Sequence, residues 1–287
     1  MTAHKATKIE AYSQSDIGNV REDNQDAVWL CNPDDQYTEA FGHLYAIADG
    51  MGGYAHGGVA SSLALSTFCE TFYDAGNAAI PQKMKIGMQN ANLSVYQAAQ
   101  KISAGRMGTT LTAANLVGNT LHIAHIGDSR AYLIRKNKSR CLTNDHTRVG
   151  ELVRMRLLSA DKIRSHNQRS ILNKCLGMNL FIQPDIFNVQ VQTGDALIFC
   201  TDGVWSVIED EEFGEIAATI HDPALLGKRI LELALERDSD DNVSLITVFF
   251  HQLNHQKDDS AKNKHTMISR IFRQFSKKYR GKQCSFL

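Results

Sequence analysis

The sequence has no excess of charge of either sign, because 31 Lys and Arg residues are balanced by 31 Asp and Glu residues. A chain without net charge has no overall basic field to attract nucleic acid or anionic membrane, so any such surface must be local. The six cysteines form no C-x-x-C pair, and several lie inside apolar runs, which is typical of reduced, buried thiols. No apolar run approaches the roughly 18 residues of a membrane-spanning helix, and no secretory h-region is evident. We therefore expect a soluble, cytoplasmic protein with no nucleic-acid partner.

The most informative stretch is residues 46–53, where a short apolar run ends at Asp49 and a cluster of glycines follows. We interpret the run as a buried strand that delivers Asp49 to a loop. Gly50, Gly52 and Gly53 carry no Cβ, so the loop can adopt positive φ and bring backbone carbonyls close to a ligand. A carboxylate beside an exposed carbonyl suits a hard cation.

The same pattern, an acid at the end of an apolar run, recurs at Asp202, Asp128 and Asp241. Four such acids without interleaved His or Cys favour coordination by oxygen alone, which selects Mg²⁺ or Mn²⁺ over zinc or copper. For any one acid taken alone, a solvated turn residue is the better interpretation, because Asp favours turns. The recurrence is what favours a metal site.

Two metal ions that share Asp49 are the simplest arrangement, because carboxylates so close together raise one another's pKa unless cations neutralise them. Two metals about 3.5–4 Å apart can hold a hydroxide and clamp an in-line displacement at phosphorus. The planar guanidinium of Arg21, in the polar loop of residues 18–26, would then bind phosphate oxygens.

The order of the predicted elements indicates a layered α+β domain. Residues 109–135 are predicted to form an antiparallel meander, with Gly118 and Asn119 in a tight hairpin turn. The composition changes near His251, and no internal repeat or second catalytic module is evident. We expect strands over 9–13, 26–30, 109–116, 120–126, 130–135, 185–191, 196–201 and 243–250, and helices from about 60–72, 81–104, 147–158, 159–165, 209–220 and 223–237.

Seven short motifs resemble, in order and spacing, those of bacterial-type metal-dependent protein phosphatases of the 2C family, across about residues 8–250. The resemblance implies an antiparallel β-sandwich with helical pairs on both outer faces. It also implies hydrolysis of phosphoserine and phosphothreonine in proteins by a binuclear metal centre with a bridging hydroxide. The motifs are Gly18-x-x-Arg21-x-x-Asn24-x-Asp26, Asp49-Gly-Met-Gly-Gly53 with Gly57 and Ala60-Ser61, Gly108-Thr-Thr110, Gly127-Asp-Ser-Arg130, Leu142-Thr-x-Asp-His-Thr147, Thr201-Asp-Gly203 and Asp241-Asn242.

The resemblance assigns metal ligands position by position. Asp49 corresponds to the metal-bridging carboxylate and Gly50 to a carbonyl ligand, while Asp202 and Asp241 correspond to the other ligands of the first metal. Asp26 corresponds to the acid that serves the second metal through water. The expected cofactors are Mn²⁺ or Mg²⁺, two in each site.

Further roles follow from the same resemblance. Asp128 together with Asp202 would make the third metal site of bacterial members, and Arg21 is the phosphate-binding position. Residues 147–183 correspond to the variable flap that shapes substrate access. His56 is a candidate acid for the leaving serine oxygen, with metal-bound water as the alternative acid, and His146 is expected to be structural.

The chain departs from the family pattern at three positions. Gln25 stands where the family usually has Glu, Tyr54 where many bacterial members have His, and Gly58 where Glu is common. Loss of the Glu should weaken the second metal site, although Gln25 can still hydrogen-bond the water there. Met51 stands where eukaryotic members carry a proposed acid His.

Residues 1–252 are thus expected to be the catalytic domain and residues 253–287 a tail. In the tail, Ile268, Ile271, Phe272 and Phe275 form an apolar stripe among Arg and Lys, as in a basic amphipathic helix. The chain continues to Cys284-Ser-Phe-Leu287, which fits a C-a-a-X prenylation signal loosely. Lipidation of Cys284, with contact to anionic membranes, is one hypothesis, and docking on a partner or on the catalytic domain is the other.

The leading function is an active phosphatase that acts, as a monomer, on the phosphoprotein substrates of a Ser/Thr kinase. The rival is a pseudophosphatase that keeps the fold to bind phosphoproteins, with weak or no turnover. A sandwich with acidic turns and no metal is the third alternative.

Overall fold

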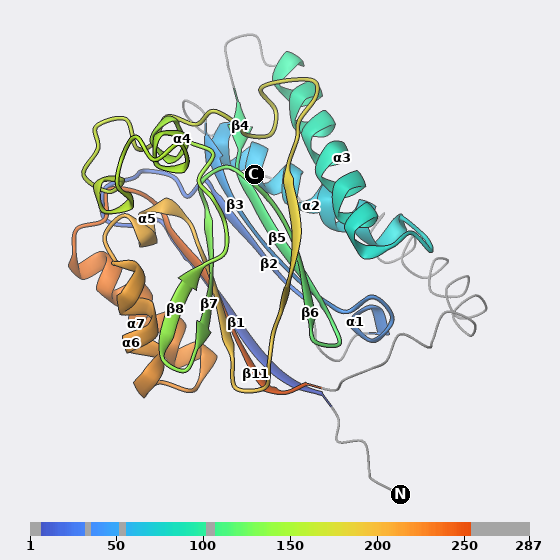
Figure 1. The fold of residues 1–287 in the computed structure, drawn as a ribbon. Coiled ribbons are helices and arrows are strands. Elements are labelled where there is room, and N and C mark those ends of the chain that lie inside the picture. The colour runs from blue at the N-terminus through green and yellow to red at the C-terminus, as the bar shows by residue number, and fades with distance from the viewer. Residues whose placement is uncertain (1–6, 32–35, 52–55, 102–106, 254–287) are drawn as a thin grey trace, which may run out of the picture.

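The computed structural model describes residues 7–31, 36–51, 56–101 and 107–253, without the side chains of residues 36, 37 and 39. Two antiparallel sheets face each other (Figure 1). One has the strand order β1-β11-β10-β7-β8, and the other has the order β2-β3-β5-β6-β9 with β4 paired to β3. The strands are β1 Lys8–Asp16, β2 Asp26–Leu30, β3 His43–Met51, β4 Gly108–Thr109, β5 Leu111–Val117, β6 Thr120–Ile126, β7 Arg130–Arg135, β8 Lys138–Cys141, β9 Asp185–Gln190, β10 Ala196–Cys200 and β11 Val243–Gln252.

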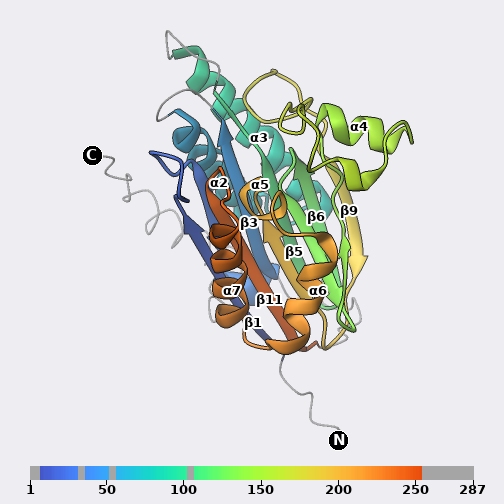
Figure 2. The same cartoon turned by 90° about the vertical axis from the view of Figure 1, so that its left-hand side faces the viewer.

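Helices cover both outer faces of this sandwich (Figure 2). Helices α2 and α3 pack on the sheet that contains β3, and α6 and α7 pack on the sheet that contains β11. This arrangement confirms the predicted sandwich with helical pairs. The helices are α1 Gln36–Phe41, α2 His56–Asp74, α3 Ile80–Lys101, α4 Arg148–Arg154, α5 Asp202–Trp205, α6 Asp210–Thr219 and α7 Pro223–Glu236, with a 3-10 turn at Ala160–Lys162.

The apolar pattern of each element explains its layer. In β10 all five residues are buried, because one face meets the opposite sheet and the other meets the helices. Leu197 and Phe199 lie in the core between the sheets, whereas Ile198 and Cys200 lie under the helices. In α2, Ala60, Ala64, Phe68 and Phe72 are fully buried at a spacing of four residues, as predicted.

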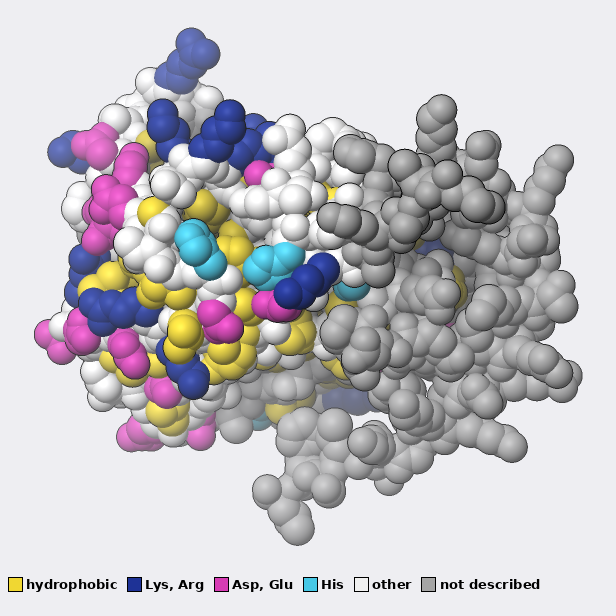
Figure 3. All heavy atoms as spheres, turned by 90° about the horizontal axis from the view of Figure 1, so that it is seen from below, with side chains coloured by type: hydrophobic (Ala, Val, Ile, Leu, Met, Phe, Trp, Pro, Cys, Tyr) yellow, Lys and Arg dark blue, Asp and Glu magenta, His cyan; other side chains and the backbone are white. Residues whose placement is uncertain are grey.

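The cysteines also lie as expected in the described part of the chain. Cys31, Cys69, Cys175 and Cys200 are buried free thiols, and Cys141 is half-buried. No helix among the described residues has the length and apolarity that crossing a bilayer would require. Viewed from below Figure 1, basic and acidic side chains are interspersed on the described surface (Figure 3), so this face carries no field of one sign.

The predicted meander of residues 109–135 is only partly correct. β5 and β6 pair as a hairpin whose turn is at Gly118 and Asn119, with Gly118 at φ 61°. However, β7 pairs with β10 and β8 and therefore belongs to the other sheet. The chain changes sheet at Gly127, which has φ 112° and whose backbone lies against Thr110, so that a Cβ would lie 2.4 Å from the Thr110 Cβ.

Several predicted boundaries differ in the structure. The short polar elements α1 and β8 were not expected, since neither shows clear apolar periodicity. The two helices predicted over 147–165 are shorter, namely α4 and a single 3-10 turn. The Thr147 hydroxyl accepts a hydrogen bond from the Gly150 amide at 2.9 Å and so caps the start of α4.

Candidate active site

The predicted acids come from both sheets and lie near one another. Asp26 begins β2 and pairs directly with Asp49 of β3. Asp202 begins α5 immediately after β10, and Asp241 lies just before β11. Asp128 lies where the chain passes from β6 to β7, so each acid is at or near the end of a strand.

The pKa values of these acids show that their carboxyls are buried and interact with one another. Desolvation raises the pKa of Asp26 to about 8, and the nearby charges of Asp202 and Asp241 add to this rise. Desolvation and the charges of Asp26 and Asp202 hold the pKa of Asp49 well above its usual range. The pKa of Asp128 is raised in the same way, with Asp202 as the largest charge effect. Such mutual repulsion favours cations at this position.

Asp202 carries the clearest indication of a missing partner. Desolvation raises its pKa to about 6, and the charges of Asp241 and Asp240 add to this rise. Its Oδ1 atom is buried and accepts no hydrogen bond. Leaving a buried acceptor unsatisfied costs about 1–3 kcal/mol, more when it is charged. A cation bound between these carboxylates would satisfy this oxygen.

The available donors are oxygens, and this set fits Mg²⁺ or Mn²⁺. Within the described residues, no group of three His, Cys, Asp or Glu side chains is already arranged as a complete metal-binding set. A bound cation would therefore draw carboxylates together and displace the protons they hold. The fit rests on donor chemistry, raised pKa values and the unpaired Asp202 oxygen.

Backbone hydrogen bonds fix Asp49 and leave its carboxyl for other contacts. Its amide donates to the Thr110 hydroxyl at 2.9 Å. Its carbonyl accepts from the Thr110 amide and from the Thr109 hydroxyl, both at 2.8 Å. Thr109 and Thr110 thus hold the backbone of Asp49 rigidly.

The glycines next to Asp49 were predicted to allow positive φ, and this is wrong for Gly50. Gly50 is required for close packing, because a Cβ there would lie 2.0 Å from the Gly57 carbonyl oxygen. A Cβ on Gly57 would in turn lie 2.0 Å from Gln25 Oε1. Asp49 and Gly50 are still within β3, which ends at Met51, and Gln25 packs directly beside them. Gly52, Gly53 and Tyr54 lie outside the described residues.

Arg21 lies beside the acids, as the phosphate-binding assignment requires. Its Nη2 atom is 2.6 Å from Asp241 Oδ2, and its Nε donates to the Asp240 carbonyl at 3.2 Å. The Arg21 side chain remains 53% exposed, so it is accessible to a ligand. Its loop approaches closely at Gly18, where a Cβ would lie 2.4 Å from the Asp241 carbonyl oxygen.

Two residues without a predicted role hold this loop and its acid. Asn242 donates from Nδ2 to the carbonyls of Ile17 and Asp23, and its Oδ1 accepts from the Gln25 amide. The Thr201 hydroxyl donates to Asp26 Oδ2 at 2.9 Å. Both residues adjoin predicted ligands and lie within the quoted motifs, but the motifs alone did not say what these two side chains contact.

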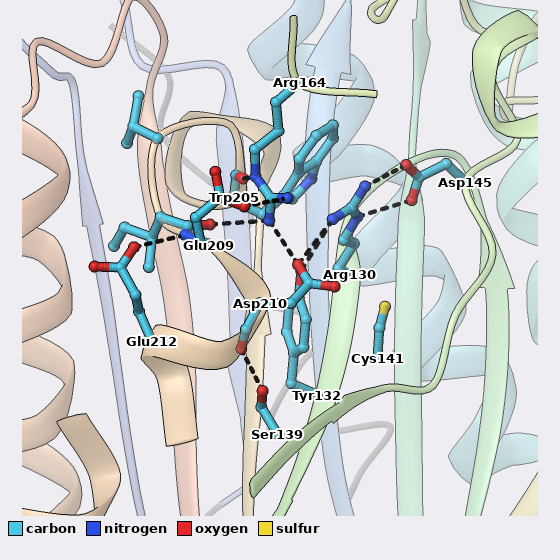
Figure 4. Close-up of polar contacts among 12 residues, drawn as sticks. Arg130, Tyr132, Ser139, Cys141, Asp145, Arg164, Trp205, Glu209, Asp210 and Glu212 are labelled. Atoms are coloured by element: carbon cyan, nitrogen blue, oxygen red, sulfur yellow. Dashed lines mark hydrogen bonds and ion pairs between the residues drawn. The ribbon is translucent and has the colours of Figure 1, made fainter. Parts of the chain in front are cut away.

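A cluster that includes Trp205, Arg130 and Asp145 (Figure 4) contacts Asp128 through Trp205. The Trp205 indole N–H donates to the Asp128 carbonyl at 2.9 Å. The Arg130 guanidinium stacks on the Trp205 ring at 3.8 Å and makes two hydrogen bonds to Asp145, at 2.7 and 3.0 Å. Both partners of this ion pair are about 95% buried, so loss of Asp145 would leave Arg130 without its main counterion.

The two histidines differ in their surroundings. His56 was expected on a loop, but it is the half-buried first residue of α2, and residues 52–55 before it are not described. His146 is buried and stacks on His125, and its Nδ1 accepts from the Gly127 amide at 3.2 Å. Its Nε2 lies 3.3 Å from Asp185 Oδ2. These contacts support the structural role expected for His146.

Residues 10–243 match the family model described as "Protein phosphatase 2C". The chain therefore belongs to the protein phosphatase 2C family, as its motifs indicated.

Among curated proteins, it is 33% identical over 244 residues to the serine/threonine protein phosphatase PstP of Mycobacterium tuberculosis. That match covers 84% of the chain but 45% of PstP, so the chain matches less than half the length of this relative. It is also 28% identical to the serine/threonine phosphatase Stp of Listeria innocua, with 84% of the chain and 95% of Stp covered.

Solved structures show the same fold. The phosphatase MsPP from Mycobacterium smegmatis, in complex with cacodylate, aligns with TM-score 0.75 and 31% identity over 85% of this chain and all of that one. The catalytic domain of PstP in complex with 2 manganese ions aligns with TM-score 0.72 and 28% identity, over 84% and 97% of the two chains.

Proposed function

We propose that this chain is a metal-dependent phosphatase that removes phosphate from phosphoserine and phosphothreonine in proteins. The observation that carries the proposal is the group of five interacting acids, in which Asp202 Oδ1 is buried without a hydrogen bond. Membership of the protein phosphatase 2C family and the names of the bacterial relatives support it.

The acids divide into roles by the positions they occupy. Asp49, the Gly50 carbonyl, Asp202 and Asp241 would hold the first cation, with Asp49 shared. Asp26 would serve the second cation through water. The manganese ions in the PstP catalytic domain support two cations of this type. When bound, such cations supply an activated water nucleophile and stabilise negative charge at phosphorus.

A third cation would be held by Asp128 and Asp202. Their carboxyls interact strongly enough that Asp202 is the largest charge effect on the pKa of Asp128. The third site, and Mn²⁺ or Mg²⁺ as the bound cation, are proposals that go beyond the centre of two cations.

Arg21 would bind the phosphate of the substrate. Its half-exposed guanidinium is held near the acids by Asp241 and by the Asp240 carbonyl. The N–H donors of this guanidinium would bind a dianionic phosphate more strongly than they bind a single carboxylate. His56 remains a candidate for giving a proton to the leaving serine or threonine oxygen.

The alternative is a phosphoprotein-binding module with weak or no turnover. Gln25 in place of Glu favours it, since the second cation would then have one charged partner fewer. Retention of all five acids favours an active enzyme. Manganese titration of turnover distinguishes the two functions, because a binding module would hold phosphopeptide without releasing inorganic phosphate.

The partners we propose are phosphoprotein substrates of a Ser/Thr kinase, acted on by a monomer in the cytoplasm. Membrane contact through the basic tail and lipidation of Cys284 are further hypotheses from the sequence. The structure does not describe residues 254–287, and the family match ends at residue 243. Neither the structure nor the family match therefore supports the two hypotheses about the tail. The division into a catalytic domain of 1–252 and a tail of 253–287 likewise remains a prediction.

A further inference from the structure

Arg164 joins the middle of the flap to the turn that follows β10 (Figure 4). Its Nε donates to the Trp205 carbonyl at 2.8 Å, and its Nη2 donates to the Ile208 carbonyl at 3.0 Å. Nη2 also lies 2.6 Å from Asp210 Oδ1, and Nη1 lies 2.9 Å from Glu209 Oε2. The Arg164 side chain is only 15% exposed, whereas its partner Glu209 is 63% exposed, so the bonds to the Trp205 and Ile208 carbonyls are the more buried part of this contact.

The segment held by Arg164 includes one of the proposed metal ligands. Helix α5 is a single turn that begins at Asp202 and ends at Trp205. The last carbonyls of a helix have no partner within it, and a cation there is favourable. Arg164 supplies both a hydrogen bond and a positive charge at this end, and so fixes the turn whose first residue is Asp202.

The same turn also supports Asp128. The Trp205 side chain is 1% exposed, and its indole N–H donates to the Asp128 carbonyl. Arg164 thus holds the backbone of the residue whose side chain holds Asp128. Through one tryptophan, a flap residue is connected to both acids of the proposed third cation site.

The other hydrogen bonds between flap and core do not make this connection. The Asn173 amide donates to the His146 carbonyl, and the Gly177 amide donates to Asn92 Oδ1. Leu176 pairs with Thr109 in an isolated bridge near the end of the flap. These contacts hold the C-terminal part of the flap. Nearer its middle, Arg169 Nη2 lies 3.5 Å from Asp240 Oδ2, and both of these side chains are more exposed than that of Arg164. Of these contacts, those of Arg164 are the ones that reach α5.

We infer that Arg164 is a positioning residue. It couples the packing of the flap against the core to the arrangement of Asp202 and Asp128. The inference rests on the proposed function of these acids as cation ligands. Coupling of this kind is reciprocal. Cation binding must therefore stabilise the packed position of the flap by the same free energy by which that position strengthens cation binding.

The test compares Arg164→Ala with Arg164→Lys and with Arg154→Ala. Lysine keeps the charge and one hydrogen bond, so it should lie between wild type and alanine. Arg154 is a matched control, because it is a flap arginine whose side chain is 56% exposed and pairs only with Glu151 in the described residues. Mn²⁺ affinity is measured by titration calorimetry, and amide hydrogen exchange is followed in residues 157–171 and 202–208 with and without Mn²⁺.

We expect Arg164→Ala to weaken Mn²⁺ binding about fivefold or more, the lower range for coupled sites. Mn²⁺ should slow exchange in residues 157–171 of the wild type and of Arg154→Ala, and this protection should be lost in Arg164→Ala. A purely structural role would lower the thermal midpoint without removing the protection of the flap by Mn²⁺.

Two results would overturn the inference. One is a folded Arg164→Ala protein in which the Mn²⁺ affinity and the protection of flap amides from exchange are both unchanged. The other is an Arg164→Lys protein that behaves the same as the wild type, together with an Arg164→Ala protein that is merely unfolded. Failure of the proposed function gives a different result, since the wild type itself would then bind no Mn²⁺ at the acids and would release no phosphate.

Discussion

Arg21 and Asp241 form an ion pair, with 2.6 Å between Nη2 and Oδ2. The proposed phosphate-binding group is therefore attached to a proposed metal ligand. The pair is formed across 220 residues of sequence by the loop after β1 and the residues before β11. If the proposed roles hold, this pair would place the substrate phosphate next to the cations.

Replacement of Arg21 by Ala should raise the KM for a phosphopeptide by roughly tenfold, because a charge-assisted hydrogen bond contributes about 1.5–3 kcal/mol. Mn²⁺ affinity should be retained, since the change frees Asp241 Oδ2. Steady-state kinetics at saturating Mn²⁺ and calorimetric titration check the two effects. Collapse of Mn²⁺ affinity with an unchanged KM would assign Arg21 to the structure of the loop instead.

Gln25→Glu should lower the Mn²⁺ concentration needed for half-maximal activity. The added charge would lie beside Asp49 and Gly50 of β3, where Gln25 Oε1 already approaches Gly57 closely. A glutamate there would strengthen the second cation site. Activation curves for wild type and variant, measured side by side, decide the point, and superimposable curves would show that the substitution is neutral.

Binding of Mn²⁺ near pH 7 should release protons. Burial raises the pKa of Asp26 to about 8 and that of Asp202 to about 6, from an ordinary value of 3.8. A cation must displace any protons held on these carboxyls. Calorimetry in buffers of different ionisation enthalpy measures the release, and the observed enthalpy should depend on the buffer. An enthalpy independent of the buffer would mean that the acids are already ionised.

The same shifts fix the sign of the pH dependence of stability. Between the unfolded and folded pKa values the native state binds more protons, so metal-free stability should fall as the pH rises from about 4 to about 8. The gain in thermal midpoint on adding Mn²⁺ should correspondingly be larger near pH 8 than near pH 6.

The tail allows a separate prediction that does not depend on the active site. If Cys284 is prenylated, the wild type expressed in a eukaryotic cell should fractionate with membranes, because a prenyl group and a polybasic stretch together give stable anchoring. Cys284→Ser should remain in the soluble fraction. Equal soluble distributions, with an unmodified Cys284 by mass spectrometry, would leave partner docking as the role of the tail.

Much of the site could be predicted because its signals are local in the sequence. An acid next to an apolar run identified Asp49, Asp128, Asp202 and Asp241, and strand ends of a closed sandwich lie close together in space. The exposed loop of residues 18–26 was recognisable because it is too polar for a core. These inferences need only short-range patterns.

The parts of the fold and of the site that were not predicted depend on contacts between residues far apart in the sequence. From its sequence β7 was expected to be the third strand of the meander, but it pairs with β10, whose residues are 62 to 70 positions further on. Asn242 acts through loop residues 217 to 225 positions away. Arg164 appears in the sequence as one of several surface arginines of the flap, and only its contacts to Trp205 and Ile208 distinguish it.

The central claim is that the cluster of acids holds catalytic cations. Its most direct test is the release of inorganic phosphate from a phosphothreonine peptide as a function of Mn²⁺, for wild type and for Asp49→Asn and Asp202→Asn. These substitutions remove charge with little change of shape, so the variants should fold. We expect turnover by the wild type that is abolished by a chelator and absent in both variants. Full activity of either variant at saturating Mn²⁺ would contradict the account.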